Sequence, residues 1–278
     1  RRAPAKINLG LHVLRKRADG YHDVETVLHR IAWADRVAVT SADRLAMTCS
    51  DPALPTDEGN LCMQAAVRLK EAFGVERGAA LHLDKRVPYG AGLGGGSSDA
   101  AATLALLNEW WQLDAPPEML RRLAAEIGAD VPFFLEASDA ALATGRGDVL
   151  APLHDARGAP YRMPFALVVV VPDVHVATPE AYGLVTPNEE GRADLPALVR
   201  SNDLARWRAA LVNDFEGPIL EAYPAVRAAK AMLLDAGAAY ASLSGSGSAV
   251  YGIFERAEAA RAAAKAARAA GLRVFADA

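Results

Sequence analysis

The sequence has 278 residues, of which 52% are hydrophobic, and a formal net charge of −4. This length is enough for two domains, or for one large domain with an ample core. The small charge has no long block of one sign, which argues against an electrostatic surface for nucleic acid or for an anionic membrane. The longest apolar run, residues 165–171, stops at Pro172 and predicts a buried strand, since it is too short to cross a bilayer.

Cysteine and histidine usage gives no sign of a zinc site or a disulfide. Cys49 and Cys62 lack metal-ligand spacing, and the six histidines form no ligand pattern. No charged and then apolar leader opens the sequence, so we expect a cytoplasmic protein, and the start at Arg1 suggests that a few native residues precede it. The expected assembly is a monomer or a homodimer.

Alternating apolar residues predict a β-hairpin at the start of the chain. One strand includes Ile7 and Val13, a polar turn follows at Asp19 and Gly20, and a second strand covers residues 24–31. The patterns in the rest of this half predict strands at 37–40, 79–83, 140–144 and 149–153 and helices at 61–73, 98–111 and 117–127.

A polar stretch with glycine and proline, residues 154–160, predicts a domain boundary. The expected domains are residues 1–156 and 157–278. The second half predicts, in order, a strand at 165–171, helices near 195–211 and 225–236, strands on both sides of 244–248, an amphipathic covering helix at 259–270 and a last strand. Strands and helices interleave without a strict β-α-β repeat, which favours the α+β class.

A glycine-rich loop is the most informative local feature. It consists of Pro88, Tyr89, Gly90, Ala91, Gly92, Leu93, Gly94, Gly95, Gly96, Ser97 and Ser98. Glycines adopt backbone conformations closed to other residues, so successive N–H groups can converge on an anion, and the following helix adds the positive end of its dipole. Ser97 and Ser98 can each cap that helix or bind a phosphate oxygen, and Ser98 can reach a phosphate-bound Mg²⁺. The loop predicts a triphosphate cradle.

Other interpretations of the loop fit less well. Gly90, Gly92 and Gly95 satisfy G-x-G-x-x-G, but a dinucleotide site needs a buried strand before the loop and an acidic residue ending the next strand. The Walker pattern fails because no lysine precedes Ser97. A flexible linker is disfavoured because such linkers do not usually end in a capped apolar helix.

Three motifs in this order resemble the signatures of the GHMP kinases, the galactokinase, homoserine, mevalonate and phosphomevalonate kinase superfamily. They are residues 4–9, the glycine loop at 88–98 and residues 242–250. The resemblance spans nearly the whole chain. It implies an ATP-dependent small-molecule kinase with a two-domain α+β GHMP kinase fold. The N-terminal domain would be ribosomal-protein-S5-domain-2-like and bind ATP with Mg²⁺, and the C-terminal domain would be ferredoxin-like and complete the substrate cleft.

The resemblance also implies catalytic roles. Asp130 would be the base that accepts the hydroxyl proton, and Lys6 the cation between it and the γ-phosphate. Asn8 lies two residues on along the strand, on the same face as Lys6, and would orient Asp130 or the substrate hydroxyl. Taken alone, such a lysine is more often a solvated edge residue, and an aspartate before Val-Pro is more often a helix N-cap.

Residues 17–22, 128–134 and 213–216 resemble the branch of these kinases whose alcohol substrate carries a cytidine diphosphate group. By that resemblance, Tyr21 and His22 bind the base, His22 reads the cytosine edge, and Tyr182 supplies the opposing aromatic face. The bland alternatives are an exposed turn and a core aromatic. Tyr89 and Arg146 depart from the aliphatic residues that are frequent at these positions, and we expect neither to touch the chemistry.

Two further sets of residues complete the candidate site. Asn60 and Leu61 match the adenine-pocket region, although Asn60 can equally be a simple helix cap. Ser244 and Gly245 lie in a Ser-Gly loop that can form a second backbone nest close to the substrate phosphates, or be only a small-residue hairpin. The alternatives for the whole chain are a homoserine-type or mevalonate-type kinase, and a nucleotide-binding module that has lost catalysis.

Overall fold

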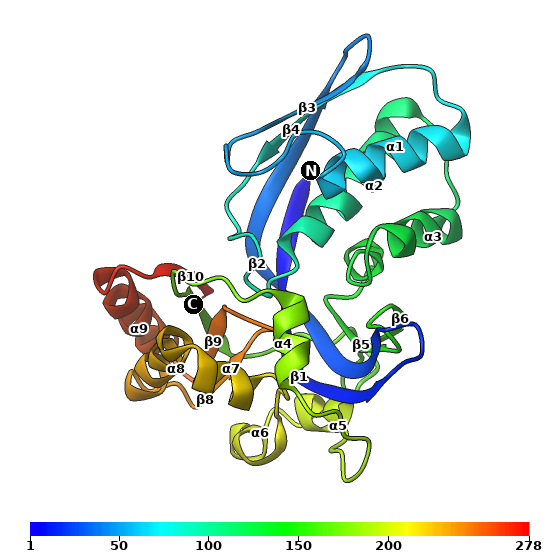
Figure 1. Ribbon diagram of the computed structural model, residues 1–278. Coiled ribbons are helices and arrows are strands. Elements are labelled where there is room, and N and C mark those ends of the chain that lie inside the picture. Colours follow the sequence, from blue (N-terminus) through cyan, green and yellow to red (C-terminus); the bar gives the residue numbers. More distant parts are fainter. Residues whose placement is uncertain (278) are drawn as a thin grey trace. The chain divides into compact units, whose positions relative to one another are not determined.

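The computed structural model describes residues 1–277, which divide into two compact units (Figure 1). The first unit comprises residues 1–5, 32–89 and 94–137, and the second comprises residues 6–31, 90–93 and those from 138 onward. The long strands β1 (Arg2–Lys16) and β2 (His22–Thr40) contribute residues to both units. These units are compact bodies of interleaved segments, and the domain boundary expected at residue 156 stays a prediction.

In the first unit, a small sheet carries a layer of helices. Its strands are β3 (Leu45–Cys49), β4 (Ala79–Asp84) and the end of β2, with β3 parallel and β2 antiparallel to β4. The helices are α1 (Leu61–Phe73), α2 (Gly95–Trp111), α3 (Pro117–Ile127) and a 3-10 helix, η1 (Pro132–Leu135). The helices α1, α2 and α3 lie against one another (Figure 1) and bury Leu69, Leu104 and Trp111 in one core with Leu81 of β4.

The second unit contains two antiparallel strand groups. In one, the start of β2 pairs with β5 (Ala140–Thr144), which pairs with β6 (Val149–Pro152). The other has the order β10-β7-β9-β8, formed by β7 (Ala166–Val171), β8 (Tyr240–Leu243), β9 (Val250–Phe254) and β10 (Arg273–Asp277). Numbered by chain position, these four strands have the order 4-1-3-2, with helices before the second and after the third. This is the ferredoxin-like arrangement that the resemblance implied.

Two helices cover this four-stranded sheet, α8 (Pro224–Asp235) and α9 (Ala257–Ala269) (Figure 1). In α9, Ala260, Ala263, Ala264 and Ala267 are buried with the sheet residues Val168 and Val170, as expected for an amphipathic covering helix. The unit also contains α4 (Thr178–Leu184), α5 (Leu195–Arg200), α6 (Leu204–Ala210) and α7 (Glu216–Ala222).

Most predicted elements are confirmed, and the differences have local causes. The strand expected at 37–40 is the end of β2, which continues from the hairpin without a break. The helix expected near 195–211 is split into α5 and α6, with Asn202 between them in the left-handed region at φ 49°. The short strand β3 was not predicted, because only Met47 of its five residues is buried and its pattern is weak.

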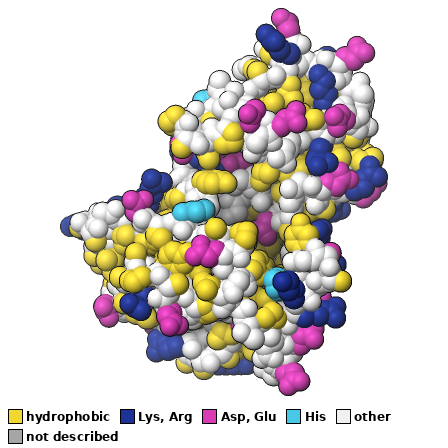
Figure 2. All heavy atoms as spheres, viewed as in Figure 1, with side chains coloured by type: hydrophobic (Ala, Val, Ile, Leu, Met, Phe, Trp, Pro, Cys, Tyr) yellow, Lys and Arg dark blue, Asp and Glu magenta, His cyan; other side chains and the backbone are white. Residues whose placement is uncertain are grey.

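Neither a single-sign surface patch in the view of Figure 2 nor a membrane-spanning helix is found in the part of the chain that the structure describes. On the face seen in Figure 2, acidic and basic side chains are interspersed. Within residues 1–277, no helix has both the length and the apolar character needed to cross a membrane.

Candidate active site

Lys6 of β1 is a buried cation in the second unit. Its side chain is 4% exposed, and its Nζ donates to Asn8 Oδ1 at 2.7 Å and to the Gly92 carbonyl at 3.0 Å. The expectation that Lys6 and Asn8 share a strand face is therefore confirmed, and the solvated-edge alternative is wrong. A buried ammonium held by oriented oxygens is suited to act on nearby negative charge.

A chain of hydrogen bonds fixes the orientation of the Asn8 amide. Thr26 Oγ1 donates to the Gly10 carbonyl at 2.6 Å, so it accepts from Asn8 Nδ2, which lies 2.9 Å away. The amide oxygen of Asn8 must then face the ammonium of Lys6. Sequence reasoning missed Thr26, and the only signal was a polar residue at a buried position of a predicted strand.

Gly92 and the Ser-Gly loop lie in direct contact within the second unit. Ser244 Oγ donates to the Gly92 carbonyl at 2.9 Å, and Ala249 N donates to the Ala91 carbonyl at 3.0 Å. Asn213 Nδ2 donates to the Gly245 carbonyl at 2.9 Å and so holds the loop in turn. The third motif therefore supports residues 91–92 of the glycine loop, while its expected contact with substrate phosphates stays a prediction.

The N-terminus of α2, in the first unit, differs from the sequence expectation. The helix starts at Gly95 rather than Ser98, and its N-cap is Gly94 at φ 66°, with no side-chain cap. Ser97 and Ser98 thus lie inside the first turn, and the expectation that either one caps the helix is wrong. The Ser98 hydroxyl is buried and has no hydrogen-bond partner. An uncapped helix start beside an orphaned hydroxyl is chemically suited to a phosphate oxygen or a phosphate-bound cation.

Three charged side chains are buried together below this helix start. Lys85 Nζ lies 2.6 Å from Asp35 Oδ2 and 2.7 Å from Asp99 Oδ2, and Asp35 Oδ1 accepts from the backbone N–H of Val87 at 2.7 Å. Burial raises the pKa of Asp99 to about 7, although Lys85 lowers it. The cluster joins the residues before the glycine loop to the helix after it. Sequence reasoning missed it, because its members lie far apart in the sequence, in β2, just after β4 and in α2.

The remaining residues predicted in the first unit take up ordinary local roles. Asn60 is the N-cap of α1 and accepts from Cys62 N at 3.0 Å, so the capping alternative is confirmed. A Cβ on Gly96 would lie 3.5 Å from Leu61 Cδ1, which places Leu61 beside the first turn of α2. Asp130 lies in the turn between α3 and η1, and the N-cap of η1 is Val131. Its expected pairing with Lys6 stays a prediction.

A pocket of about 600 Å³ in the second unit brings together Tyr21, His22 and Tyr182. The His22 and Tyr182 rings stack at 4.6 Å with an interplanar angle of 15°, and Tyr182 also meets Phe215 edge-on. Burial, followed by the charge of Lys16, lowers the pKa of His22. Because the two rings already stack on each other, no base fits between them as they lie. A base would stack on an outer face instead.

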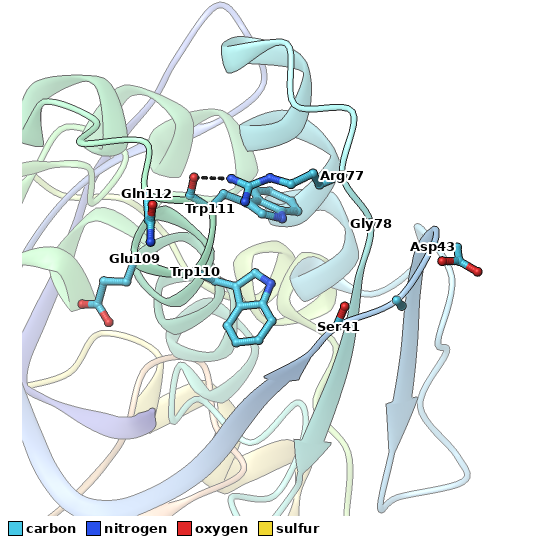
Figure 3. A pocket seen from close by; sticks show the side chains of 9 residues that line it. Ser41, Asp43, Arg77, Gly78, Glu109, Trp110, Trp111 and Gln112 are labelled. Carbon is cyan, nitrogen blue, oxygen red and sulfur yellow. Dashed lines mark hydrogen bonds between the residues drawn. The ribbon is translucent and has the colours of Figure 1, made fainter.

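A separate cavity of about 590 Å³ lies in the first unit, at the C-terminal end of α2 (Figure 3). It is lined by Trp110 and Trp111 of that helix and by Arg77, whose guanidinium donates to the Trp111 carbonyl. None of the predicted site residues lines it. It is therefore not the candidate active site.

Comparison with known proteins identifies the family. Residues 60–138 match the model of the GHMP kinases N terminal domain, and residues 195–272 match that of the GHMP kinases C terminal domain. The chain is 63% identical to the 4-diphosphocytidyl-2-C-methyl-D-erythritol kinase of Salinibacter ruber. The aligned region covers 94% of this chain and 92% of that one. The chain belongs to the 4-diphosphocytidyl-2-C-methyl-D-erythritol kinase family of GHMP kinases. It is 48% identical to the kinase of this family from Chlorobium limicola, over 91% of this chain and 88% of that one.

Solved structures agree with membership of this kinase family. A crystal structure of 4-(cytidine 5'-diphospho)-2C-methyl-D-erythritol kinase matches with a TM-score of 0.83 and 37% identity, over 99% of this chain and 97% of that one. The homoserine kinase of Cytophaga hutchinsonii shares the fold, with a TM-score of 0.70 and 20% identity over 99% and 93% of the two chains. The chain is therefore an enzyme that transfers phosphate, with ATP as the expected donor. The predicted GHMP kinase fold is confirmed, and the dinucleotide interpretation is wrong.

Proposed function

We propose that this protein catalyses the ATP-dependent phosphorylation of the 2-hydroxyl of 4-diphosphocytidyl-2-C-methyl-D-erythritol, a step of the non-mevalonate route to isoprenoid precursors. The observation that carries the proposal is the 63% identity, over nearly the full length of both chains, to a kinase named for that substrate. Homoserine-type and mevalonate-type kinases are disfavoured because the Cytophaga hutchinsonii homoserine kinase is only 20% identical to this chain and a mevalonate kinase of known structure only 12%.

In the proposed reaction, the hydroxyl oxygen of the substrate bonds to the γ-phosphorus of ATP while the bond between that phosphorus and ADP breaks. Asp130 accepts the proton that the hydroxyl loses. Lys6 donates to the transferring phosphoryl group and stabilises the charge that accumulates there. Asn8 and Thr26 support this role, because their hydrogen bonds hold an oxygen against the ammonium of Lys6. Neither a phosphorylated enzyme nor a covalent intermediate is needed.

The proposed nucleotide site uses the glycine loop for the triphosphate and Asn60 with Leu61 for the adenine. The orphaned Ser98 hydroxyl supports a contact with a phosphate oxygen or with Mg²⁺. Within residues 1–277, no group of three or more His, Cys, Asp or Glu is placed to hold a metal ion. Mg²⁺ commonly keeps several waters and is bound through one or two protein ligands plus substrate phosphates, and such a site would fit this chain.

The proposed cytidylyl site is the pocket that contains Tyr21, His22 and Tyr182. His22 would hydrogen-bond to the edge of cytosine, and an aromatic ring of the pocket would stack on its face. Ser244 and Gly245 would lie near the substrate phosphates. A cytoplasmic location and a monomeric or dimeric state complete the proposal.

The test is ADP release by the purified protein with Mg-ATP. Separate reactions contain 4-diphosphocytidyl-2-C-methyl-D-erythritol, methylerythritol phosphate, homoserine or mevalonate. The expected result is turnover with 4-diphosphocytidyl-2-C-methyl-D-erythritol and with none of the other three compounds. In the variant Asp130→Asn, kcat should fall by about 10²–10⁴-fold while ATP still binds. Turnover with another alcohol would overturn the substrate assignment. If no ADP is released with any of the four compounds although the protein binds ATP, the non-catalytic alternative is favoured.

A further inference from the structure

An arginine on the turn between β5 and β6 is held in a defined position. The Arg146 guanidinium donates to Asp148 through Nε at 3.2 Å and through Nη2 at 2.8 Å. The Gly145 carbonyl accepts from Val24 N at 2.7 Å, which ties this turn to β2. Arg146 is therefore anchored at its own turn and beside the strand that begins at His22.

The guanidinium of Arg146 lies over the ring of Tyr21, with Cζ 5.2 Å from the ring centroid. This is within the range of a cation–π interaction. Tyr21 is 58% exposed, so burial alone does little to fix the direction of its ring. The anchored arginine thus restricts the position of this ring.

Arg146 and Tyr21 line the same pocket as His22, Tyr182 and Lys16. Among the described residues, no Asp or Glu lines this pocket. The Asp148 carboxylate that pairs with Arg146 is not among the lining residues, and a lining of aromatic faces and cations suits a planar base joined to anionic phosphates, as in a nucleoside diphosphate. Because His22 and Tyr182 already stack on each other, Tyr21 supplies a separate aromatic face.

We propose that Arg146 is a positioning residue that holds the Tyr21 ring as a stacking wall of this pocket and so favours a cytidine diphosphate group. The proposal rests on the proposed function and adds a specificity determinant to it. The sequence-based expectation that Arg146 stays outside the chemistry does not account for its place in the pocket. An aliphatic residue there would leave the Tyr21 ring without its cation.

A double-mutant cycle on Arg146 and Tyr21 tests this mechanism. The variants are Arg146→Val, Tyr21→Ala and the double variant, measured by calorimetric binding of cytidine diphosphate and by steady-state kinetics. Arg146→Val should weaken binding by about two- to fivefold, as for an exposed cation–π contact, and raise KM for the cytidylyl substrate equally. KM for ATP and kcat should not change. The double variant should bind no more weakly than Tyr21→Ala, because Arg146 acts through that ring.

Two controls separate positioning from general damage. Arg146→Lys keeps a cation over the ring and should restore part of the affinity, and Arg157→Val removes an exposed arginine outside the pocket and should have no effect. Unchanged binding of cytidine diphosphate by Arg146→Val overturns the inference. So does a double variant whose loss of affinity is the product of the losses in the two single variants, since Arg146 would then contact the ligand itself. Cytidine diphosphate binding by the wild type without turnover would overturn the proposed function alone. A wild type that neither binds cytidine diphosphate nor turns over the cytidylyl substrate overturns both.

Discussion

Gly92 and Ser244 approach so closely that position 92 has no space for a side chain. A Cβ built on Gly92 would lie 2.0 Å from the Ser244 carbonyl oxygen, and the backbone there has φ +76°. The carbonyl of this same glycine accepts from Lys6 and from Ser244. The close approach of the glycine loop and the third motif at this point therefore depends on the absence of a side chain at position 92.

Gly92→Ala should lower kcat by about 100-fold, because relieving the clash must move the carbonyl that orients Lys6. The matched control is Gly158→Ala, which has a similar φ of +79° and nothing within 4 Å of the added methyl. Gly158→Ala should lower the free energy of unfolding by only about 1–2 kcal/mol, the cost of placing alanine in the left-handed region. Steady-state kinetics and urea unfolding of both variants check the prediction, and equal kcat values in the two would contradict it.

Thr26→Val should reduce kcat by about tenfold, the worth of one well-placed hydrogen bond, because Asn8 would lose the acceptor that orients its amide. Thr26→Ser keeps the hydroxyl and should retain most of the activity. Thr40→Val, at the exposed end of the same strand, serves as the control for the change of residue type. The prediction fails if Thr26→Val and Thr40→Val have the same kcat.

His22→Ala should raise KM for the cytidylyl substrate by about tenfold or more and leave KM for ATP nearly unchanged, since one hydrogen bond to the base is lost. His154→Ala removes an exposed histidine of the same unit that does not line the pocket and should behave as wild type. Kinetics with each substrate varied in turn supply the measurement. An equal rise in both KM values would mean that His22 has a structural role.

Asp99→Asn should change how stability depends on pH. The folded-state pKa of Asp99 is about 7, above the ordinary value of about 4 in an unfolded chain, so its protonated form stabilises the fold below pH 4. That stabilisation is lost as pH rises through 7. The variant lacks this titration, and its free energy of unfolding relative to wild type should therefore increase from about pH 4 to about pH 8.

Urea unfolding at a series of pH values measures this difference directly. Asp43→Asn, an exposed aspartate of the same unit, is the control and should show no such trend. A difference between Asp99→Asn and wild type that stays constant or shrinks as pH rises would show that Asp99 does not titrate in this way.

The family and most elements could be predicted from the sequence because they depend on local patterns. The glycine loop, the alternation of Lys6 with Asn8 and the alanine face of α9 are each contained within one short segment. The start of α2 was predicted three residues too late, since glycines and serines are weak helix formers and tertiary contacts override such preferences. The same limit applies to β3, which has one buried residue to mark it.

The sequence by itself determined the fold class, the kinase family and the identity of the residues expected to carry the reaction. Only the tertiary structure decided which partners hold those residues. Thr26 meets Asn8 from another strand, Lys85 lies between Asp35 and Asp99, and Arg146 reaches Tyr21. Periodicity reports which face of an element is buried, whereas these contacts depend on how separate elements meet, and that is set by packing and register across the whole unit.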